Sequence, residues 1–381
     1  MLDVYLLTLA IALALAVGTT SALLALSRTE RFFSLFHIRG VQERPRWGGV
    51  VFLATFALTP YLAAAVSPHA RQFFEPKSGS FLGLLAAASV VFLVGFLDDV
   101  RLTSPALRSF VFLGGAAAAY GAGYRVEEVG LPWGGTFGLG PAAFFATLLW
   151  VYAMTNAFNF IDGRDGVSLG VAIFACVTMA QVAAHSDHPT VALLLVALAG
   201  AGLGFLPFNL PPASAYIGDS GAYVLGFVLG TLSIRGATGP TGAVFVAVPL
   251  VALGYPLLDL VLQPLRRMLH HKHPMKGDED HIHHRLEAMG AGPRGILVVI
   301  YGIAAIFSLG AILLHYVDDT RVEAAVLGGV LLTVSVVLLR LGYVLTFWNS
   351  RSVVWLRQRV FAPAPALPPG GDSPQRDHER D

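Results

Sequence analysis

Charged residues are scarce in this chain. They make up only 13% of its 381 residues, whereas 55% are hydrophobic. Because soluble domains usually carry about 25% charged residues, this composition excludes an ordinary soluble protein and predicts a polytopic membrane protein. The formal net charge of +1 adds little, since the position of the charges along the chain carries the information here. We expect no nucleic-acid partner.

Cysteine is almost absent, and the first apolar run lacks the pattern of a signal peptide. The single cysteine, Cys176, lies inside an apolar segment, which excludes a disulfide framework and favours a small packing residue. The run over 4–26 follows Asp3 instead of a basic stretch and is too long for the core of a signal peptide. We therefore expect a retained first helix.

Apolar segments long enough to cross a membrane recur along the chain. A spanning helix needs about 20 mostly apolar residues. The pattern predicts helices at 4–26, 49–67, 80–97, 109–122, 142–161, 167–184, 190–208, 219–234, 241–260, 294–316 and 322–345. The expected fold is thus an all-α polytopic membrane protein with about eleven transmembrane helices.

Basic residues indicate the orientation. Arginine and lysine gather in the loops 27–48, 98–108 and 262–293 and after the last segment, whereas the alternate loops carry offsetting acidic residues. Because basic loops stay on the cytoplasmic side, we predict an outside N-terminus and a cytoplasmic C-terminus in the cell inner (plasma) membrane. Residues 1–361 then form one transmembrane domain, and the Pro/Gly-rich stretch 362–381 is expected to be a disordered cytoplasmic tail.

Two adjacent carboxylates, Asp98 and Asp99, close the third apolar segment. A helix C-terminus disfavours an anion by about 0.3–1 kcal/mol, and the two carboxylates also repel each other. A metal ion, an arginine or a shared proton must therefore compensate them, unless they form a solvated helix end. Adjacent helical residues point about 100° apart, so we expect the two to differ in role.

Four polar residues, Asn156, Asn159, Asp162 and Asp165, recur every three positions at the end of the fifth segment. On a helix this spacing forms a slanted polar stripe, and Gly163 then lets backbone approach a ligand. Oxygen donors of this kind suit Mg²⁺, which binds through one or two protein ligands plus substrate phosphates. The alternative is a polar contact between helices followed by a turn. The density of polar groups in a membrane protein favours the cation site.

A third polar cluster, 218–221 (GDSG), opens the eighth segment. Asp and Ser are preferred N-caps, so a structural role is a strong alternative. A helix N-terminus is also a natural phosphate site, and we expect Asp219 to ligate a metal while the backbone N–H groups near Ser220 face phosphate. Asn209 lies before the cluster, and the Pro-Pro pair that follows it makes the connecting segment extended and stiff. Asp259, which ends the ninth segment, is expected to hold a loop arginine.

The most basic loop, which contains Lys272 and Lys276, ends in a histidine cluster. The polar members of this cluster are His281, His283, His284 and Arg285. Zinc is disfavoured because neither HExxH spacing nor a cysteine partner is present. We favour an anion-binding cap, with a patch for lipid headgroups as the alternative. Arg46, in the first basic loop, is a further candidate for binding phosphate.

Together these motifs resemble the polyprenyl-phosphate N-acetylhexosamine-1-phosphate transferases, of the glycosyltransferase family 4 type, from about Arg44 to Leu286. The marks of the resemblance are Pro45-x-x-Gly48-Gly49, Asp98-Asp99, Asn156-x-x-Asn159-x-x-Asp162-Gly163-x-Asp165-Gly166, Gly218-Asp219-Ser220-Gly221 and His281-Ile282-His283-His284-Arg285. Each motif alone is weak, but their order and their shared membrane side make the set specific.

The resemblance implies Mg²⁺, with Mn²⁺ as an alternative, held by Asp219 and Asn159. It also implies that the aspartate pair engages the polyprenyl phosphate, with one member able to act as a base. The candidate catalytic residues are Asp98, Asp99, Asp162 and Asp165. The candidate substrate-binding residues are Arg46, Arg108, Asn156, Arg164, Asn209, His281, His283, His284 and Arg285.

Three positions depart from the pattern of this family. Arg108 stands where a lysine that contacts the pyrophosphate is usual, which keeps the charge and changes its geometry. Phe112 replaces a usual glutamine. Arg164 replaces a usual apolar residue and is expected to touch the diphosphate or the uridine.

The HIHHR form is similar to the branch that uses UDP-N-acetylglucosamine or a related UDP-amino sugar. The implied reaction transfers N-acetylhexosamine-1-phosphate, with GlcNAc-1-phosphate as the first expectation, to undecaprenyl or another polyprenyl phosphate. The reaction releases UMP and is the first membrane step of cell-envelope polysaccharide synthesis. The active site is expected to face the cytoplasm. UDP-MurNAc-pentapeptide is the alternative donor, and a homodimer is implied. A secondary transporter and a lipid-binding scaffold are alternatives of other classes, although a transporter would place its polar groups near the bilayer midplane.

Overall fold

The computed structural model of this chain describes residues 1–27, 45–130, 135–237, 243–244, 246–269, 281–317 and 319–343. Several predicted features lie outside these residues. They are residues 28–44 of the first basic loop, the loop residues Lys272 and Lys276, the basic stretch after the last segment and the tail expected at 362–381.

Helices make up most of the described chain, which confirms the all-α membrane fold. They are α1 (Leu2–Ser27), α3 (Gly48–Val66), α4 (Pro68–Phe74), η1 (Glu75–Lys77), α5 (Ser78–Val100), α6 (Pro105–Gly121), α7 (Ala142–Ile161), α8 (Val167–His185), α9 (Pro189–Asn209), α10 (Gly218–Gly236), α11 (Ala247–Ala252), α12 (Gly254–Leu269), α13 (Ile282–Ala288), α14 (Pro293–Tyr316) and α15 (Thr320–Arg340). Within the described residues, eight of them, α1, α3, α5, α7, α8, α9, α14 and α15, are long and apolar enough to cross a membrane. The total of eleven spans and the orientation stay predictions.

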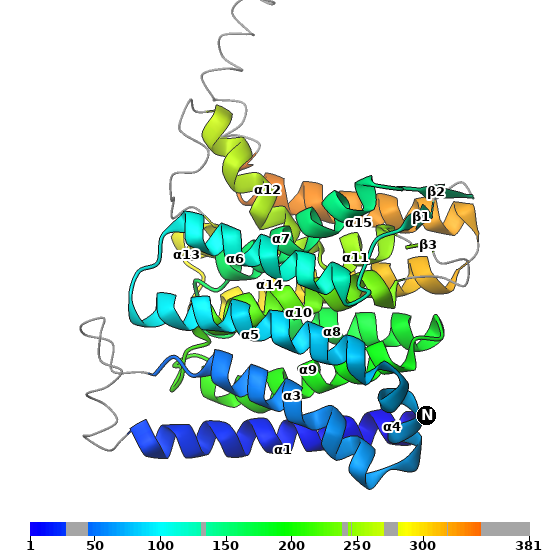
Figure 1. Cartoon of the computed structure of the whole chain (residues 1–381). Coiled ribbons are helices and arrows are strands. Elements are labelled where there is room, and N and C mark those ends of the chain that lie inside the picture. The colour runs from blue at the N-terminus through cyan, green and yellow to red at the C-terminus, as the bar shows by residue number, and fades with distance from the viewer. Residues whose placement is uncertain are drawn as a thin grey trace, which may run out of the picture.

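The ninth predicted segment is not one helix. Over 241–260 the structure has the strand β3 (Ala243–Val244), then α11, a break at Leu253, and α12. Pro256 explains the break, because proline has no N–H to donate to the carbonyl four residues earlier and is tolerated only in the first turn of a new helix. β3 pairs in parallel with β1 (Glu128–Gly130), which pairs antiparallel with β2 (Thr136–Gly138). This small sheet lies at the end of the bundle where α6 ends and α7 begins (Figure 1).

The long helices run side by side in one bundle, and α10 lies inside it (Figure 1). Every residue of α10 is buried except Asp219 and Arg235. Other helices, chiefly α3, α5, α7 and α8, surround it in place of lipid. α5 and α7 end, and α10 begins, at the same end of the bundle, which we call the site end (Figure 1).

Glycines allow this close packing around α10. A side-chain carbon on Gly226 would lie 2.5 Å from the carbonyl oxygen of Met154 in α7. On the α5 side, a side-chain carbon on Gly95 would lie 2.5 Å from Cα of Ser220. Small residues let helix backbones approach one another in membranes, where van der Waals packing drives helix association. The glycines of α5 and α10 therefore bring the polar site end of α10 close to the last turn of α5.

We expect Gly226→Ala to lower the unfolding temperature of the purified protein in detergent. The new methyl group would press on backbone, and overpacking of this kind costs about 1–3 kcal/mol. Gly114→Ala in α6 is the matched control, because no atom lies within 4 Å of a side-chain carbon built there. A Gly226→Ala protein that melts together with the control would contradict this packing.

Candidate active site

Asp98, in the last turn of α5, is held by protein donors. Its Oδ1 atom accepts hydrogen bonds from the backbone N–H and the hydroxyl of Thr103, at 2.8 and 2.9 Å. Its Oδ2 atom accepts from Nη1 of Arg108 at 2.8 Å and from the hydroxyl of Tyr223 at 3.2 Å. The Asp98 side chain is only 3% exposed. Asp98 therefore orients Arg108 from within the bundle, and an arginine supplies the compensation that the sequence required.

Asp99 binds a different set of groups, as expected for neighbours on a helix. Its Oδ1 atom accepts from the backbone N–H of Asp219 at 2.8 Å. Its Oδ2 atom accepts from the backbone N–H of Ser220 at 3.0 Å and from the Ser220 hydroxyl at 2.7 Å. Asp99 thus caps the N-terminus of α10 from another helix. The expectation that these N–H groups face a substrate phosphate is wrong, because they donate to a carboxylate of the protein itself.

Arg46 links the two acidic clusters. Its Nη1 atom lies 3.3 Å from Oδ1 of Asp99 and 3.9 Å from Oδ2 of Asp219. The backbone beside it is anchored by a hydrogen bond from the N–H of Gly48 to the carbonyl of Tyr216, 3.3 Å long. A side-chain carbon on Gly48 would lie 2.5 Å from the backbone just before α10, so only glycine fits there. The glycine turn of the first basic loop thereby brings a cation to the site end.

The loop after α7, residues 162–166, is tied to its surroundings by its last residue. Gly166 has a φ of +78°, which favours glycine. Its N–H donates to Oδ1 of Asn209 at 3.0 Å, and its carbonyl accepts from the hydroxyl of Tyr301 at 2.7 Å. The Asn209 amide nitrogen donates to the carbonyl of Ala215. Asn209 was predicted to bind substrate. Its side-chain amide instead forms hydrogen bonds with backbone groups, although the residue still lines the cavity described below.

α13 docks against the same loop through His283. A side-chain carbon on Gly163 would lie 2.5 Å from Nε2 of His283, so the loop lies directly on the imidazole. His283 is fully buried, and neither of its ring nitrogens has a hydrogen-bond partner among the described residues. Burial, with smaller contributions from His284 and His281, lowers the pKa of His283 to about 3. His283 is therefore a neutral packing partner of the loop at physiological pH.

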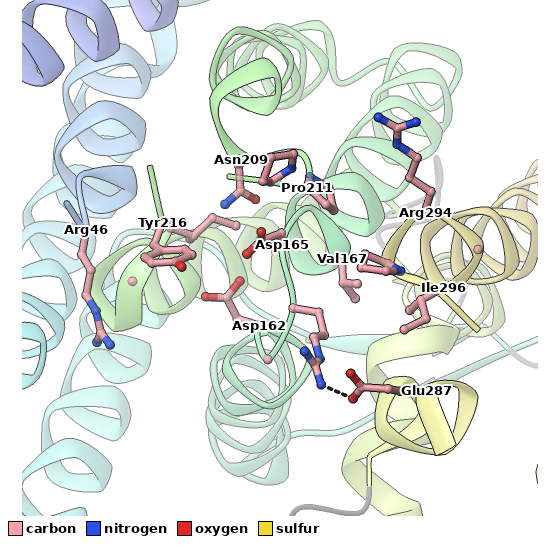
Figure 2. A pocket seen from close by; sticks show the side chains of 18 of the residues that line it. Arg46, Asp162, Asp165, Val167, Asn209, Pro211, Tyr216, Glu287, Arg294 and Ile296 are labelled. Atoms are coloured by element: carbon pink, nitrogen blue, oxygen red, sulfur yellow. Dashed lines mark hydrogen bonds and ion pairs between the residues drawn. The ribbon is translucent and has the colours of Figure 1, made fainter. Parts of the chain in front are cut away.

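A second contact joins the loop to α13. The guanidinium of Arg164 forms an ion pair with the carboxylate of Glu287, which also lies 3.9 Å from Nδ1 of His284. Arg164, expected to touch substrate, is thus held by a carboxylate at the cavity wall (Figure 2). No pattern in the sequence predicted Glu287 as its partner.

The remaining members of the histidine cluster point to other elements. Asp259 Oδ2 lies 2.6 Å from Nδ1 of His281, and its Oδ1 atom accepts from the backbone N–H of Ile282 at 3.1 Å. Asp259 therefore holds the start of α13 and not the loop arginine that the sequence predicts. Arg285 donates to the carbonyl of Leu341 at 2.9 Å, and its guanidinium carbon lies 3.8 Å from the centre of the Tyr343 ring.

A cavity of about 940 Å³ opens between these elements (Figure 2). Its size falls within the range of ligand pockets, about 300–1,000 Å³. Six predicted site residues line it: Arg46, Asp162, Arg164, Asp165, Asn209 and Asp219. Further lining residues were not singled out by the sequence, and they include Tyr216, Glu287, Arg294 and Ile296. The other predicted residues do not line it. Among them, the Asn156 amide donates to the carbonyl of Tyr152 within α7, and Asp98 and Asp99 hold Arg108 and the start of α10.

The carboxylates that line this cavity are suited to a cation. Burial first, and then the charges of Asp219 and Asp99, raise the pKa of Asp162 well above its ordinary value, although part of Asp162 still faces the cavity. A bound cation would relieve this accumulation of negative charge. In the part of the chain that the structure describes, no group of three or more His, Cys, Asp or Glu side chains forms a metal cage. The oxygen donors present fit a hard cation completed by substrate oxygens.

Tyr223 is a supporting residue that the sequence did not reveal. Its hydroxyl contacts both Asp98 and Arg108, although it lies five residues into a helix expected only to cross the membrane. One signal existed, because a buried tyrosine hydroxyl usually finds a polar partner. The partner itself could not be named without the packing of α5 against α10.

The burial of neutral His283 predicts a pH effect on stability. Its pKa is about 3 in the folded protein and about 6.5 when unfolded, so the unfolded state binds more protons between these values. Stability should therefore fall as pH drops below about 6.5, by up to about 1.4 kcal/mol per pH unit. Chemical unfolding in detergent at pH 7, 6 and 5 measures this slope. His283→Gln should reduce the dependence of the unfolding free energy on pH. An equal slope in the variant would show that His283 does not cause this dependence.

Known proteins are similar to this chain in sequence. A profile of the family described as "Glycosyl transferase family 4" matches residues 81–237. The "Probable undecaprenyl-phosphate N-acetylglucosaminyl 1-phosphate transferase" of Bacillus subtilis (strain 168) is 31% identical over 272 residues, which cover 71% of this chain and 73% of the relative. The decaprenyl-phosphate N-acetylglucosaminephosphotransferase of Mycobacterium tuberculosis (strain CDC 1551 / Oshkosh) is 30% identical over 76% of this chain and 77% of the relative.

A third relative is the undecaprenyl-phosphate alpha-N-acetylglucosaminyl 1-phosphate transferase of Escherichia coli (strain K12). It is 26% identical over 279 residues, which cover 71% of this chain and 73% of the relative. These likenesses extend over most of each chain. The family match at residues 81–237 contains most of α5 and all of α7 and α10. The chain therefore belongs to the polyprenyl-phosphate N-acetylglucosaminyl-1-phosphate transferases of glycosyl transferase family 4.

Proposed function

We propose that this protein transfers N-acetylglucosamine-1-phosphate from UDP-N-acetylglucosamine to undecaprenyl or another polyprenyl phosphate and releases UMP. The observation that carries the proposal is the cavity at the site end. Arginines and carboxylates line it together, at the end of a membrane bundle where a lipid phosphate and a water-soluble nucleotide can meet. The names of the relatives support the same donor and acceptor classes.

The reaction exchanges one phosphoanhydride for another. An oxygen of the acceptor phosphate attacks the phosphorus that carries the sugar, and the bond between that phosphorus and the bridging oxygen of the diphosphate breaks. The electron pair leaves with that oxygen on UMP. The acceptor is already largely dianionic near neutral pH, since the second pKa of a phosphate monoester is about 6. A strong base is therefore unnecessary, and the main barrier is the meeting of two anions.

The cavity contains the groups that would lower this barrier. Arg46 and Arg164 line it and carry positive charge toward a diphosphate. Fixed cations in a preorganised site stabilise charge that develops in a phosphoryl-transfer transition state. Arg108 does not line the cavity; Asp98 and Tyr223 hold it at the site end, where it would position the acceptor phosphate.

A divalent cation, Mg²⁺ or Mn²⁺, fits the same cavity. Asp219 lines the cavity, and Asn159 lies in the last turn of α7, just before the loop that lines it, so the side-chain oxygens of both residues would serve as ligands. When bound, the cation would neutralise the donor diphosphate. Asp162 lines the same cavity and lies close enough to Asp219 for their charges to interact, so it would supply a second negative charge that helps to retain the cation.

The membrane placement would serve both substrates. A polyprenyl tail must stay in lipid while the nucleotide sugar arrives from water, so we propose that the site end faces the cytoplasm at the plasma membrane. A transporter is not favoured, because the carboxylates that line the cavity lie just after α7 and at the start of α10, and these two helix ends meet at one end of the bundle (Figure 1). Release of UMP by the purified protein, dependent on the divalent cation, polyprenyl phosphate and UDP-N-acetylglucosamine together, tests the proposal. No release with any UDP-N-acetylhexosamine would refute it.

Asp219→Ala should abolish UMP release, by at least about 100-fold, because it removes the carboxylate assigned to the cation. The variant should still insert and purify as a folded protein, since its backbone N–H can still donate to Asp99. Activity is measured as UMP formed over time at saturating Mg²⁺. A variant that keeps most of the wild-type rate would show that the cation is bound elsewhere.

Arg108→Lys should keep most of the activity, whereas Arg108→Ala should lose it. Both contacts of Arg108 with Asp98 and Tyr223 come from one nitrogen, Nη1, so a lysine ammonium can replace them without a two-pronged geometry. Initial rates as a function of polyprenyl phosphate concentration test this. Equal losses in the two variants would mean that the guanidinium shape matters and not only its charge.

A further inference from the structure

Asp99, like Asp98, accepts hydrogen bonds from four protein donors, and it does not line the cavity. Its side chain is 5% exposed. Four donors reach its two oxygens: the N–H groups of Asp219 and Ser220, the Ser220 hydroxyl, and Arg46. A carboxylate surrounded in this way has no oxygen turned toward an acceptor phosphate. Its contacts are those of a support.

The donors reveal what Asp99 supports. The first N–H groups of a helix have no partner inside that helix, and burial without a partner is costly. α10 begins inside the bundle, so its first turn needs an acceptor that another element must provide. Asp99 provides it at the very residue, Asp219, whose side chain lines the cavity. The cap therefore fixes the backbone from which the Asp219 carboxylate projects.

Arg46 completes the arrangement. It lies between the carboxylates of Asp99 and Asp219, at 3.3 and 3.9 Å, and offsets their mutual repulsion. The α10 N-terminus carries partial positive charge that also favours the Asp99 anion. Asp219 is compensated less closely than Asp99, because the Arg46 guanidinium lies farther from the Asp219 carboxylate. Asp219 is thus left with charge to share with a ligand in the cavity.

We propose that Asp99 is a positioning residue that caps α10 from α5 and so holds Asp219 in place to bind the divalent cation, instead of exchanging a proton with the acceptor. The inference rests on the proposed role of Asp219 as a cation ligand. Groups that orient a metal ligand commonly change metal affinity or activity by about 10- to 100-fold when they are removed. The loss on removing Asp99 should therefore appear as weakened cation binding that excess cation restores.

The experiment measures Mn²⁺ binding to purified protein in detergent, without substrates, from the electron paramagnetic resonance signal of free Mn²⁺. Asp99→Asn should weaken binding about 10- to 100-fold. Ser220→Ala removes one of the four donors to Asp99 and should weaken binding by a smaller factor; it keeps the test possible if Asp99→Asn does not fold. UMP release by Asp99→Asn should return toward the wild-type rate as Mn²⁺ or Mg²⁺ is raised.

Asp319→Asn is the matched control. Asp319 caps α15 by accepting from the N–H of Arg321 at 2.8 Å, so the change removes the same charge at another helix N-terminus, away from the cavity. Its Mn²⁺ affinity should equal that of the wild type.

Two outcomes would overturn the inference, and they differ. If Asp99→Asn and Ser220→Ala bind Mn²⁺ as tightly as the wild type, while Asp99→Asn stays inactive at saturating cation, Asp99 acts in the chemistry and the cation assignment to Asp219 stands. If the wild type shows no Mn²⁺ site that Asp219→Ala removes, the cation assignment itself fails and the inference fails with it.

Discussion

Negative charge gathered at one end of an apolar bundle is the constraint on which this structure depends. Carboxylates in a membrane protein are costly unless cations or hydrogen-bond donors meet them. Here Asp98 and Asp99 are compensated by different groups. Asp98 is met by Arg108, and Asp99 is met by Arg46 and the first turn of α10. The carboxylates left to face the cavity, Asp162 among them, are those that a bound cation and its substrates would neutralise.

The tight packing of α10 makes these solutions possible. Glycines at the contacts with α5 and α7 bring helix axes close, so the last turn of one helix reaches the first turn of another. The loop 162–166 is then held from three sides, by Asn209, by Tyr301 and by His283. These contacts from other elements give the loop a defined shape beside the cavity. A fixed loop suits a site that must place two anions in line.

Much of this arrangement could be predicted from the sequence, since ten of the expected apolar segments correspond to helices and the separated motifs do meet around one cavity. The ninth segment was mistaken for a single helix because its hydropathy is continuous, whereas Pro256 removes a backbone donor. The division of labour among the polar residues was also beyond the sequence. Asn209 and Arg285 were expected at substrate, yet Asn209 binds backbone at the cavity wall and Arg285 binds the end of α15.

The sequence by itself determined that this is a membrane protein of many helices, with acidic, amide and basic motifs at their ends. Composition and periodicity are local properties, and they suffice for that conclusion. Only the tertiary structure decided which carboxylates are satisfied by the protein and which face the cavity. The pairing of Asp99 with α10, or of Arg164 with Glu287, depends on contacts between residues more than a hundred positions apart, and the packing of whole helices selects such contacts.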